Sequence, residues 1–236
     1  MKINGHQNLK SIKKKILFCG KKNDRYSNKI LQFLKKKDFL LKSILTSSSK
    51  KITEKEKKLI YSNNYDFIFC FRSHIIIKIN KLNKNCVPIN FHPGPPQYRG
   101  IGCVNFALLN KEKKYGATAH IMNNKIDNGP ILNVMRFNIS NKLSLEEVLE
   151  KTYIIQLKQF KKIINKILNK KIKLKKIITI NKKIKWSKKL YLKKDLMKLY
   201  NLANYIKRYE VTDLFRATLT KKFKPYFKFK NMIFKL

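Results

Sequence analysis

Apolar residues in the first part of the chain gather in short runs that alternate with amphipathic segments. Residues 15–20, 39–45 and 66–71 have the length of strands, and the third run is continuously apolar, which is typical of a strand buried on both faces. Between the first two runs, apolar positions recur at helical spacing over residues 30–34, and Ser27 is placed to cap that helix. The pattern therefore predicts strands that alternate with helices.

The same alternation continues to residue 137. Thr53 and Glu56 form a capping-box pattern ahead of a short helix, and another helix is expected near residues 104–110. Further strand-like runs follow at residues 88–92, 118–122 and 131–137. Strands that alternate with helices predict an α/β fold, a Rossmann-like and mostly parallel sheet with helices on both faces.

The second part of the chain has a different pattern. Ser144 and Glu147 form a second capping box, which opens a long amphipathic helix. Residues 169–188 are rich in lysine and are expected to form a linker or an edge hairpin. A helix near residues 195–205 and an aromatic, basic end follow. These segments predict a small appendage after the main domain.

At 236 residues the chain is long enough for one full hydrophobic core and a small extra unit. We predict a main domain over residues 1–170 and, over residues 171–236, a linker hairpin with a small C-terminal tail domain. The first residues are basic, and the apolar run that begins at Ile16 is too short to span a bilayer. We therefore expect a cytoplasmic protein without membrane insertion.

Lysine dominates the composition and gives a formal net charge of +43 at pH 7. Such a charge raises the hypothesis of nucleic-acid binding. Only six of the 56 basic residues are arginine, however, and arginine is the residue best suited to bidentate recognition of phosphates and base edges. Lysine is also spread over nearly every predicted helix and loop, which favours a compositional bias on solvated faces. We therefore favour a compositional bias over a nucleic-acid partner, and tRNA stays open as the alternative.

Cysteine spacing gives no sign of a metal site. No pair of cysteines has the spacing of metal ligands, and most of them lie in apolar, strand-like runs. We expect buried, reduced thiols and no bound metal at Cys19, Cys70, Cys86 and Cys103.

The candidate chemistry begins in the stretch of residues 87–100. Asn90 and His92 alternate with apolar residues, so on a strand their side chains share one face. The prolines that follow cannot donate the hydrogen bonds of a sheet, so the strand is expected to stop just after the histidine. An amide and an imidazole then lie at the carboxyl end of a strand, where open α/β sheets bind their ligands.

A carboxylate is the third candidate group. Asp127 precedes Gly129 and Pro130, which signal a turn, so it is expected in a loop that joins two strands. Alone, an Asp in this setting is more often a turn residue than a catalytic one. A lone strand-end histidine is likewise more often packed than catalytic. The combination of the three groups favours an enzyme site.

Together these elements resemble the folate-dependent N-formyltransferases. The matching pattern is Asn-x-His, then Pro-Gly-Pro-Pro-x-Tyr-x-Gly and, further along, Asp-x-Gly-Pro, and the resemblance covers about residues 15–137. Members of this family move a formyl group from N10-formyltetrahydrofolate to an amine. The resemblance therefore implies that co-substrate and a formyltransferase catalytic domain over the predicted main domain.

Transfer of a formyl group to an amine passes through a tetrahedral intermediate with a negative oxygen and a positive nitrogen. Asn90, through its NH2 group, and His92 are placed to bond the oxyanion. Asp127 can hold His92 in its working tautomer and help to remove the ammonium proton, and whether His92 or Asp127 takes that proton stays open. By resemblance, two backbone segments enclose the pterin, and they match Ser73, His74, Ile75, Ile76, Met122, Asn123, Asn124, Lys125 and Ile126.

Several acceptor classes compete. Glycinamide ribonucleotide transformylases are disfavoured, because they have two glycines in the loop after the first strand where this chain has only Gly20. Methionyl-tRNA formyltransferases fit the charge, but they carry a sizeable C-terminal barrel, for which the tail from Leu190 is short. A basic RNA-binding module without catalysis is a further alternative. It is disfavoured because a pure binding role does not need Asn90, His92 and Asp127 together.

The favoured class is the sugar N-formyltransferases, which act on nucleotide-linked amino sugars for bacterial surface glycans such as O-antigen. They are similar in their His-Pro-Gly loop and in an Arg-Ala segment of the tail, here Arg216-Ala217. Where the wider family has Ser-Leu-Leu-Pro, this chain has Gly94-Pro-Pro-Gln97. By resemblance, substrate binding is expected at Pro95, Tyr98, Arg99 and Gly100.

In this interpretation Tyr98 contacts the sugar nucleotide and Arg99 pairs with its diphosphate. The expected partners are a dTDP- or UDP-linked amino sugar and a second copy of the chain. The aromatic residues of the tail are expected either to pack under the core or to form the contact between the two copies. Methionyl-tRNA is the alternative acceptor.

Overall fold

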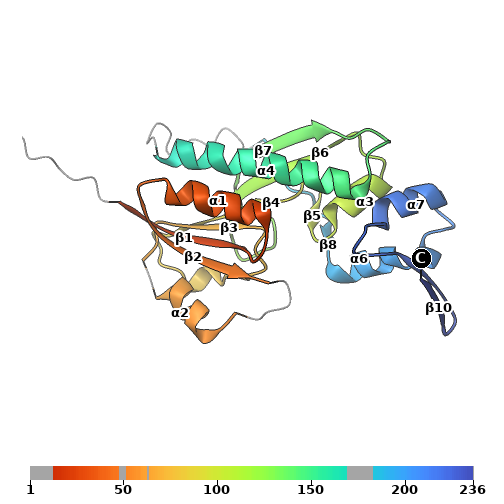
Figure 1. Cartoon of the computed structure of the whole chain (residues 1–236), viewed down its shortest axis with the longest axis horizontal. Helices are drawn as coiled ribbons and strands as arrows, with labels where there is room; N and C mark the ends of the chain where they lie inside the picture. Colours follow the sequence, from red (N-terminus) through yellow and green to blue (C-terminus); the bar gives the residue numbers. More distant parts are fainter. Residues whose placement is uncertain (1–12, 48–51, 63, 169–182, 236) are drawn as a thin grey trace, which may run out of the picture.

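The computed structural model describes residues 13–47, 52–62, 64–168 and 183–235. These residues form a six-stranded sheet in the order β2-β1-β3-β4-β6-β7 (Figure 1). The strands of this sheet are β1 (Lys14–Lys21), β2 (Phe39–Thr46), β3 (Phe67–Phe71), β4 (Val87–His92), β6 (Lys114–Ile121) and β7 (Ile131–Asn138). The helices that accompany them are α1 (Arg25–Lys35), α2 (Glu54–Tyr61), the short 3-10 helix η1 (Ile79–Lys81), α3 (Cys103–Leu109) and α4 (Leu145–Leu168).

Strand direction changes twice across the sheet, because β6 runs opposite to its five companions. The neighbours β2, β1, β3 and β4 are parallel, whereas β6 pairs antiparallel with β4 and β7 antiparallel with β6. The predicted α/β fold class with a mostly parallel sheet is confirmed. Because β4 lies between β3 and β6, its carboxyl end is flanked by the residues after β3 and by the residues of β6.

The two faces of the sheet are covered by different helices. Alternate residues of β1 point to opposite faces of the sheet. Ile16 and Phe18 face the core under α1 and α4, and Leu17 faces the core that includes α2 (Figure 1). Phe160 of α4 lies at the centre of the first core, where its ring contacts those of Phe18, Phe69, Phe71 and Phe91. Burial of such a ring contributes about 1.5–3 kcal/mol.

The tail shares a core with the main domain. It consists of β8 (Leu190–Tyr191), which pairs with the short strand β5 (Arg99–Gly100), and of α6 (Lys193–Tyr200), η2 (Leu202–Asn204), α7 (Val211–Thr218), β9 (Tyr226–Phe229) and β10 (Met232–Lys235). Leu199 and Leu214 pack in one cluster with Phe106 of α3 and Val148 of α4. The described tail is therefore held by contacts to α3 and α4.

Most element boundaries lie close to the prediction, with three differences. The carboxylate of Asp24, rather than Ser27, caps α1 by accepting the Ser27 N–H. β6 begins four residues earlier than expected, and the predicted helix at 195–205 is divided into α6 and η2. The capping boxes at Thr53 and Ser144 are confirmed.

The predicted boundary between residues 170 and 171 and most of the predicted linker lie outside the described residues. Within the described ranges, no helix combines the length and the apolar character that crossing a bilayer requires.

Candidate active site

The end of β4 forms one side of the site. Asn90 and His92 alternate with core residues of the strand, and the ring of His92 is only 2% exposed. Its Nε2 lies 2.7 Å from the carbonyl oxygen of Tyr98. A side chain at Gly94 would place its Cβ 2.6 Å from this nitrogen, so the glycine permits the contact. The chain turns back after the strand and presents a carbonyl to the imidazole.

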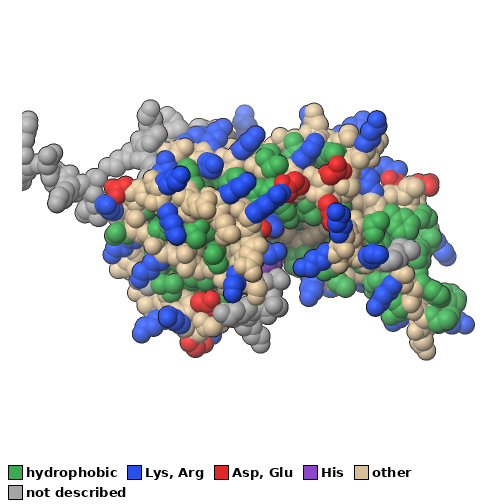
Figure 2. Space-filling view, in the orientation of Figure 1, with side chains coloured by type: hydrophobic (Ala, Val, Ile, Leu, Met, Phe, Trp, Pro, Cys, Tyr) green, Lys and Arg blue, Asp and Glu red, His purple; other side chains and the backbone are tan. Residues whose placement is uncertain are grey.

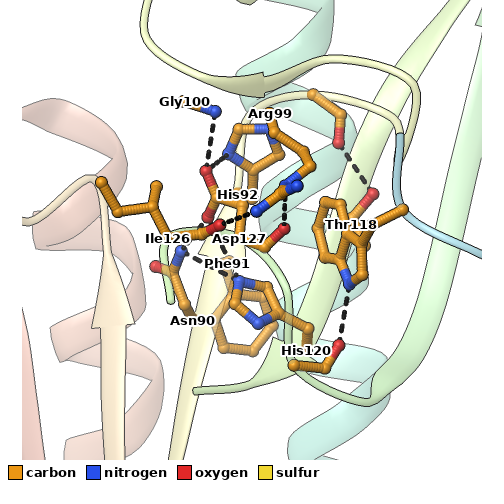
Figure 3. A network of polar contacts seen from close by, with 12 residues as sticks. Asn90, Phe91, His92, Arg99, Gly100, Thr118, His120, Ile126 and Asp127 are labelled. Atoms are coloured by element: carbon orange, nitrogen blue, oxygen red, sulfur yellow. Dashed lines mark hydrogen bonds and ion pairs between the residues drawn. The ribbon is translucent and has the colours of Figure 1, made fainter. Parts of the chain in front are cut away.

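Asp127 lies at the centre of the polar network, in the loop between β6 and β7 (Figure 3). Its φ of 41° lies in the left-handed region, which Asp tolerates better than most residues. Its Oδ2 accepts the Gly100 N–H at 2.9 Å and lies 3.2 Å from His92 Nδ1. Its Oδ1 lies 3.3 Å from Asn90 Nδ2 and 3.3 Å from His120 Nε2. The structure therefore brings Asn90, His92 and Asp127 together.

Sequence reasoning missed His120. The antiparallel register of β4 and β6 places this residue directly opposite Asn90. Its Nδ1 lies 3.0 Å from the carbonyl oxygen of Ile121, and its Nε2 lies 3.3 Å from both Asp127 Oδ1 and Asn90 Nδ2. The ring is thus held from two sides, and it positions the carboxylate of Asp127.

Trp186, the one tryptophan of the chain, was also missed. Its Nε1 donates to the carbonyl oxygen of Gly129 at 2.8 Å. Its ring meets His120 and His92 edge to face, with centroids 5.0 and 5.9 Å apart. The segment before β8 therefore packs against both histidines and shields them from water.

The electrostatic balance favours an ionised carboxylate beside a neutral imidazole. Burial opposes ionisation of Asp127, but the neighbouring His92 and His120 and the Gly100 N–H outweigh it and hold the pKa of this carboxyl well below its usual range. Burial lowers the pKa of His92 below its ordinary value, and Asp127 and the Tyr98 carbonyl oppose this shift only in part. A proton added to the imidazole would meet an acceptor at each ring nitrogen.

Arg99 does not face a ligand site. It is 9% exposed, and its guanidinium donates to the carbonyl oxygens of Ile126 and Asp127, each at 2.7 Å, and of Ser187 at 2.9 Å (Figure 3). Its nitrogens fix the Asp127 loop against the segment before β8. This placement differs from the expected contact with a diphosphate, because each of the three guanidinium nitrogens donates to a backbone carbonyl.

Tyr98 also lies apart from the expected sugar contact. It is buried in the core shared with the tail, where its ring stacks on Tyr191 and its hydroxyl donates to Glu112 at 2.8 Å. Pro95 is buried as well, whereas Gly100 lines a cavity. Of the four predicted substrate residues, Gly100 alone lies on a described cavity wall.

Two cavities meet at the network. The larger cavity, of about 500 Å³, is lined by residues at the ends of β1, β3 and β4, by the start of α3, and by α4, α6 and the tail. The smaller cavity, of about 380 Å³, is lined by residues after β3 and by the loop after β6. Ser73, Asn90 and Asp127 line both, while His92 lines only the larger cavity and His120 only the smaller. Figure 2 shows a hollow between the sheet and the tail, with basic side chains around its mouth.

The predicted folate residues fall mainly on the smaller cavity. Its walls include Ser73 and both isoleucines, Ile75 and Ile76, together with all five residues from Met122 to Ile126. His74 differs, since it lines only the larger cavity. The two backbone segments expected to enclose a pterin thus form the walls of one cavity.

This fold and site define an α/β enzyme in which two substrate-sized cavities share one polar network. The sequence model of the formyl transferase family matches residues 9–164. Because this match covers more than half of the chain, the protein belongs to the formyl transferase family. The family expected from the motif is confirmed.

The similar proteins fall into two groups. A methionyl-tRNA formyltransferase from Finegoldia magna is 31% identical over 105 residues, which are 43% of this chain. The match spans 34% of that relative, so the chain spans about a third of its length.

Solved structures match over nearly the whole chain. A 4-N formyltransferase from Francisella tularensis has a TM-score of 0.75 at 22% identity and covers 94% of this chain and 96% of its own. An N-formyltransferase from Helicobacter canadensis, in complex with folinic acid and dTDP-3-aminofucose, has a TM-score of 0.69 at 17% identity and covers 95% and 98%. These likenesses confirm the Rossmann-like formyltransferase fold.

Proposed function

We propose that the protein transfers the formyl group of N10-formyltetrahydrofolate to the amine of a nucleotide-linked amino sugar, dTDP- or UDP-linked. The observation that carries this proposal is the meeting of the two cavities at Asn90 and Asp127. A transfer between two large substrates requires both reacting atoms at one point, and holding them there removes much of the entropic barrier.

The formyl donor is assigned to the smaller cavity. Its walls are the two backbone segments that match the pterin-binding segments of the family, and Ile75 and Ile77 add buried apolar surface. The Helicobacter canadensis structure, which contains folinic acid, supports a folate in a protein of this fold. A folate in this cavity would direct its formyl group toward Asn90.

Asn90 is proposed to stabilise the oxyanion. The Asn90 NH2 group contacts Asp127 Oδ1 and His120 Nε2 at 3.3 Å each, which is long for a hydrogen bond. A formyl oxygen that enters the site is therefore a better acceptor for one of these hydrogens. Negative charge that develops on this oxygen strengthens the bond further.

His92 is proposed to receive the amine proton. The low pKa of Asp127 makes its carboxylate a weak base, whereas burial lowers the pKa of His92 and favours the neutral imidazole, which has a nitrogen lone pair to take up a proton. The imidazolium that forms would donate to both Asp127 Oδ2 and the Tyr98 carbonyl. Asp127 is proposed to orient His92 and to relay the proton.

The amino-sugar acceptor is assigned to the larger cavity. Leu196 and Tyr200 of α6, together with Thr220 and Phe223, close this cavity from the tail side. A cavity completed by the tail fits a small-molecule acceptor. Matches to solved sugar N-formyltransferases over 94% of the chain support this choice over methionyl-tRNA, whose formyltransferases fit the net charge of +43.

A screen of amine acceptors tests the function. The full chain is supplied with N10-formyltetrahydrofolate and, in turn, with dTDP- and UDP-linked amino sugars and methionyl-tRNA, and release of tetrahydrofolate is measured. We expect turnover with a nucleotide-linked amino sugar. Turnover with methionyl-tRNA alone would contradict the proposal. The expected role in surface-glycan synthesis depends on this result.

The state of His92 predicts an acid limit to activity. Burial lowers its pKa, so neutral imidazole persists below the ordinary value of 6.5, and it is lost only as the pH falls through the lowered pKa. The ratio kcat/KM should therefore be level near neutral pH and fall on the acid side at a pH below 6.5. A pH profile of kcat/KM measures this limit, and an acid limb centred above pH 7 would contradict a neutral His92.

The hairpin of β9 and β10 is proposed to form a homodimer with a second copy. Phe229, Met232 and Phe234 are 54–61% exposed, and the register of the two strands places them on one face of the hairpin, where they form an apolar patch. We expect a dimer in light scattering and a monomer for Met232→Lys, because a charge in this patch would have to be desolvated. The proposed dimer contact would be contradicted by a parent chain that is monomeric at micromolar concentration, or by a variant that is still dimeric.

A further inference from the structure

Arg72, the residue after β3, lines the larger cavity and supports an inference that rests on the proposed function. Its Nε donates to Asp24 Oδ1 at 3.1 Å, and its Cζ lies 3.5 Å from the centroid of the Tyr153 ring. The carboxylate and the aromatic ring fix the plane of the guanidinium. Within the described part of the chain, the two terminal nitrogens of Arg72 have no hydrogen-bond partner.

The backbone at Arg72 is unusual as well. Its φ of 52° lies in the left-handed region, which costs a long side chain conformational energy. Strained residues of this kind gather at functional sites, where the surrounding structure holds them in place. The chain keeps an arginine at a position that glycine or asparagine would occupy with less strain.

Lys21 and His74 complete a basic cluster with Arg72. β1 and β3 are parallel neighbours with Gly20 opposite Phe71, so the residues that follow, Lys21 and Arg72, leave the same edge of the sheet. All three basic residues line the larger cavity. Burial, and then the charges of Lys21 and Arg72, lower the pKa of His74, as expected where cationic groups crowd together.

The carboxylates near this cluster neutralise its positive charge only in part. Asp24 bonds the Nε side of Arg72 and also caps α1, so it occupies the helix N-terminus itself. Glu150 of α4 is bonded by Arg25 and Tyr26. Lys21 and the terminal nitrogens of Arg72 remain available to an anion in the cavity.

We propose that Lys21, Arg72 and His74 form the subsite for the diphosphate of the acceptor. A planar guanidinium with two free terminal nitrogens matches a phosphate bidentately, and a lysine beside it adds a second charge. Arg99, which the motif suggested for this role, donates from each guanidinium nitrogen to a backbone carbonyl and does not line the larger cavity. Since the cluster and Asn90, His92 and Asp127 line one cavity, a diphosphate bound here directs the sugar toward the reacting centre.

Calorimetric titration of the full chain with inorganic pyrophosphate, dTDP and UDP tests the subsite. Arg72→Asn removes the guanidinium and suits the positive φ. Lys21→Asn and Lys22→Asn form a matched pair, because Lys22 is exposed and lies outside the cavity wall. We expect Arg72→Asn and Lys21→Asn to weaken binding by about 10- to 100-fold. Lys22→Asn should bind within about twofold of the parent. Folinic acid binding should stay unchanged in all three variants.

If Arg72→Asn and Lys21→Asn both bind pyrophosphate, dTDP and UDP as tightly as the parent, the proposed subsite is wrong. That result would not contradict the sugar acceptor. If Arg72→Asn fails to fold, equal binding by Lys21→Asn and Lys22→Asn overturns the subsite. If the variants lose pyrophosphate binding but the parent chain formylates no amino-sugar nucleotide, the result supports the diphosphate subsite and contradicts the proposed acceptor. A parent chain that binds no diphosphate but formylates methionyl-tRNA would overturn both.

Discussion

Asp127→Asn is expected to lower kcat/KM by about 10³- to 10⁴-fold, the size of effect seen when a carboxylate that orients a histidine becomes an amide. The carboxylate oxygens of Asp127 face Gly100 N, His92 Nδ1, Asn90 Nδ2 and His120 Nε2. An amide has one acceptor oxygen, and its NH2 group would face groups that must donate. His92 would then lose its partner for the second proton. Steady-state kinetics with the accepted amino sugar measure this loss.

The substitution is conservative for the backbone. Asparagine tolerates a φ of 41° as well as aspartate does, so the loop should keep its shape. Asp213→Asn is the matched control, because this carboxylate pairs with Lys111 away from both cavities. Asp127→Asn with activity within tenfold of Asp213→Asn would remove the carboxylate from the proposed mechanism.

His92→Ala is expected to lower kcat by about 10²-fold or more, because it removes the proposed proton acceptor. The space left by the ring should accept free imidazole, and added imidazole should restore part of the activity. Rescue of this kind separates a chemical role from a structural one. Thermal unfolding and folinic acid binding check the fold of the variant.

Two results would contradict this role for His92. Near-normal turnover of the alanine variant would remove His92 from the chemistry. An inactive variant that binds folinic acid normally but is not rescued by imidazole would reduce His92 to a residue that holds the Tyr98 carbonyl and the loop after β4.

The sequence predicted the groups that lie in local patterns. Alternation along one strand places Asn90 and His92 on one face, and Gly129 and Pro130 place Asp127 in a loop. These features depend on backbone geometry over a few residues, and the structure has the same arrangement. The α/β fold followed for the same reason, since the period of the apolar residues distinguishes strands from helices.

Groups that meet through long-range packing were not predictable in this way. His120 reaches Asn90 because β6 runs antiparallel to β4, and a lone histidine in a strand does not encode that pairing. Trp186 reaches both histidines because the segment before β8 returns to the site. Arg99 looked like a ligand contact because its loop is adjacent to His92, but the backbone carbonyls that bind it come from distant segments.

The central claim is direct transfer of a formyl group between the two cavities that meet at Asn90 and Asp127. N10-formyltetrahydrofolate labelled with carbon-13 in the formyl group, mixed with the full chain and a nucleotide-linked amino sugar, tests it by nuclear magnetic resonance. The account predicts that the label leaves the folate and appears as a formamide on the sugar nitrogen. Label that stays on the folate, or that appears only as free formate, would contradict the account.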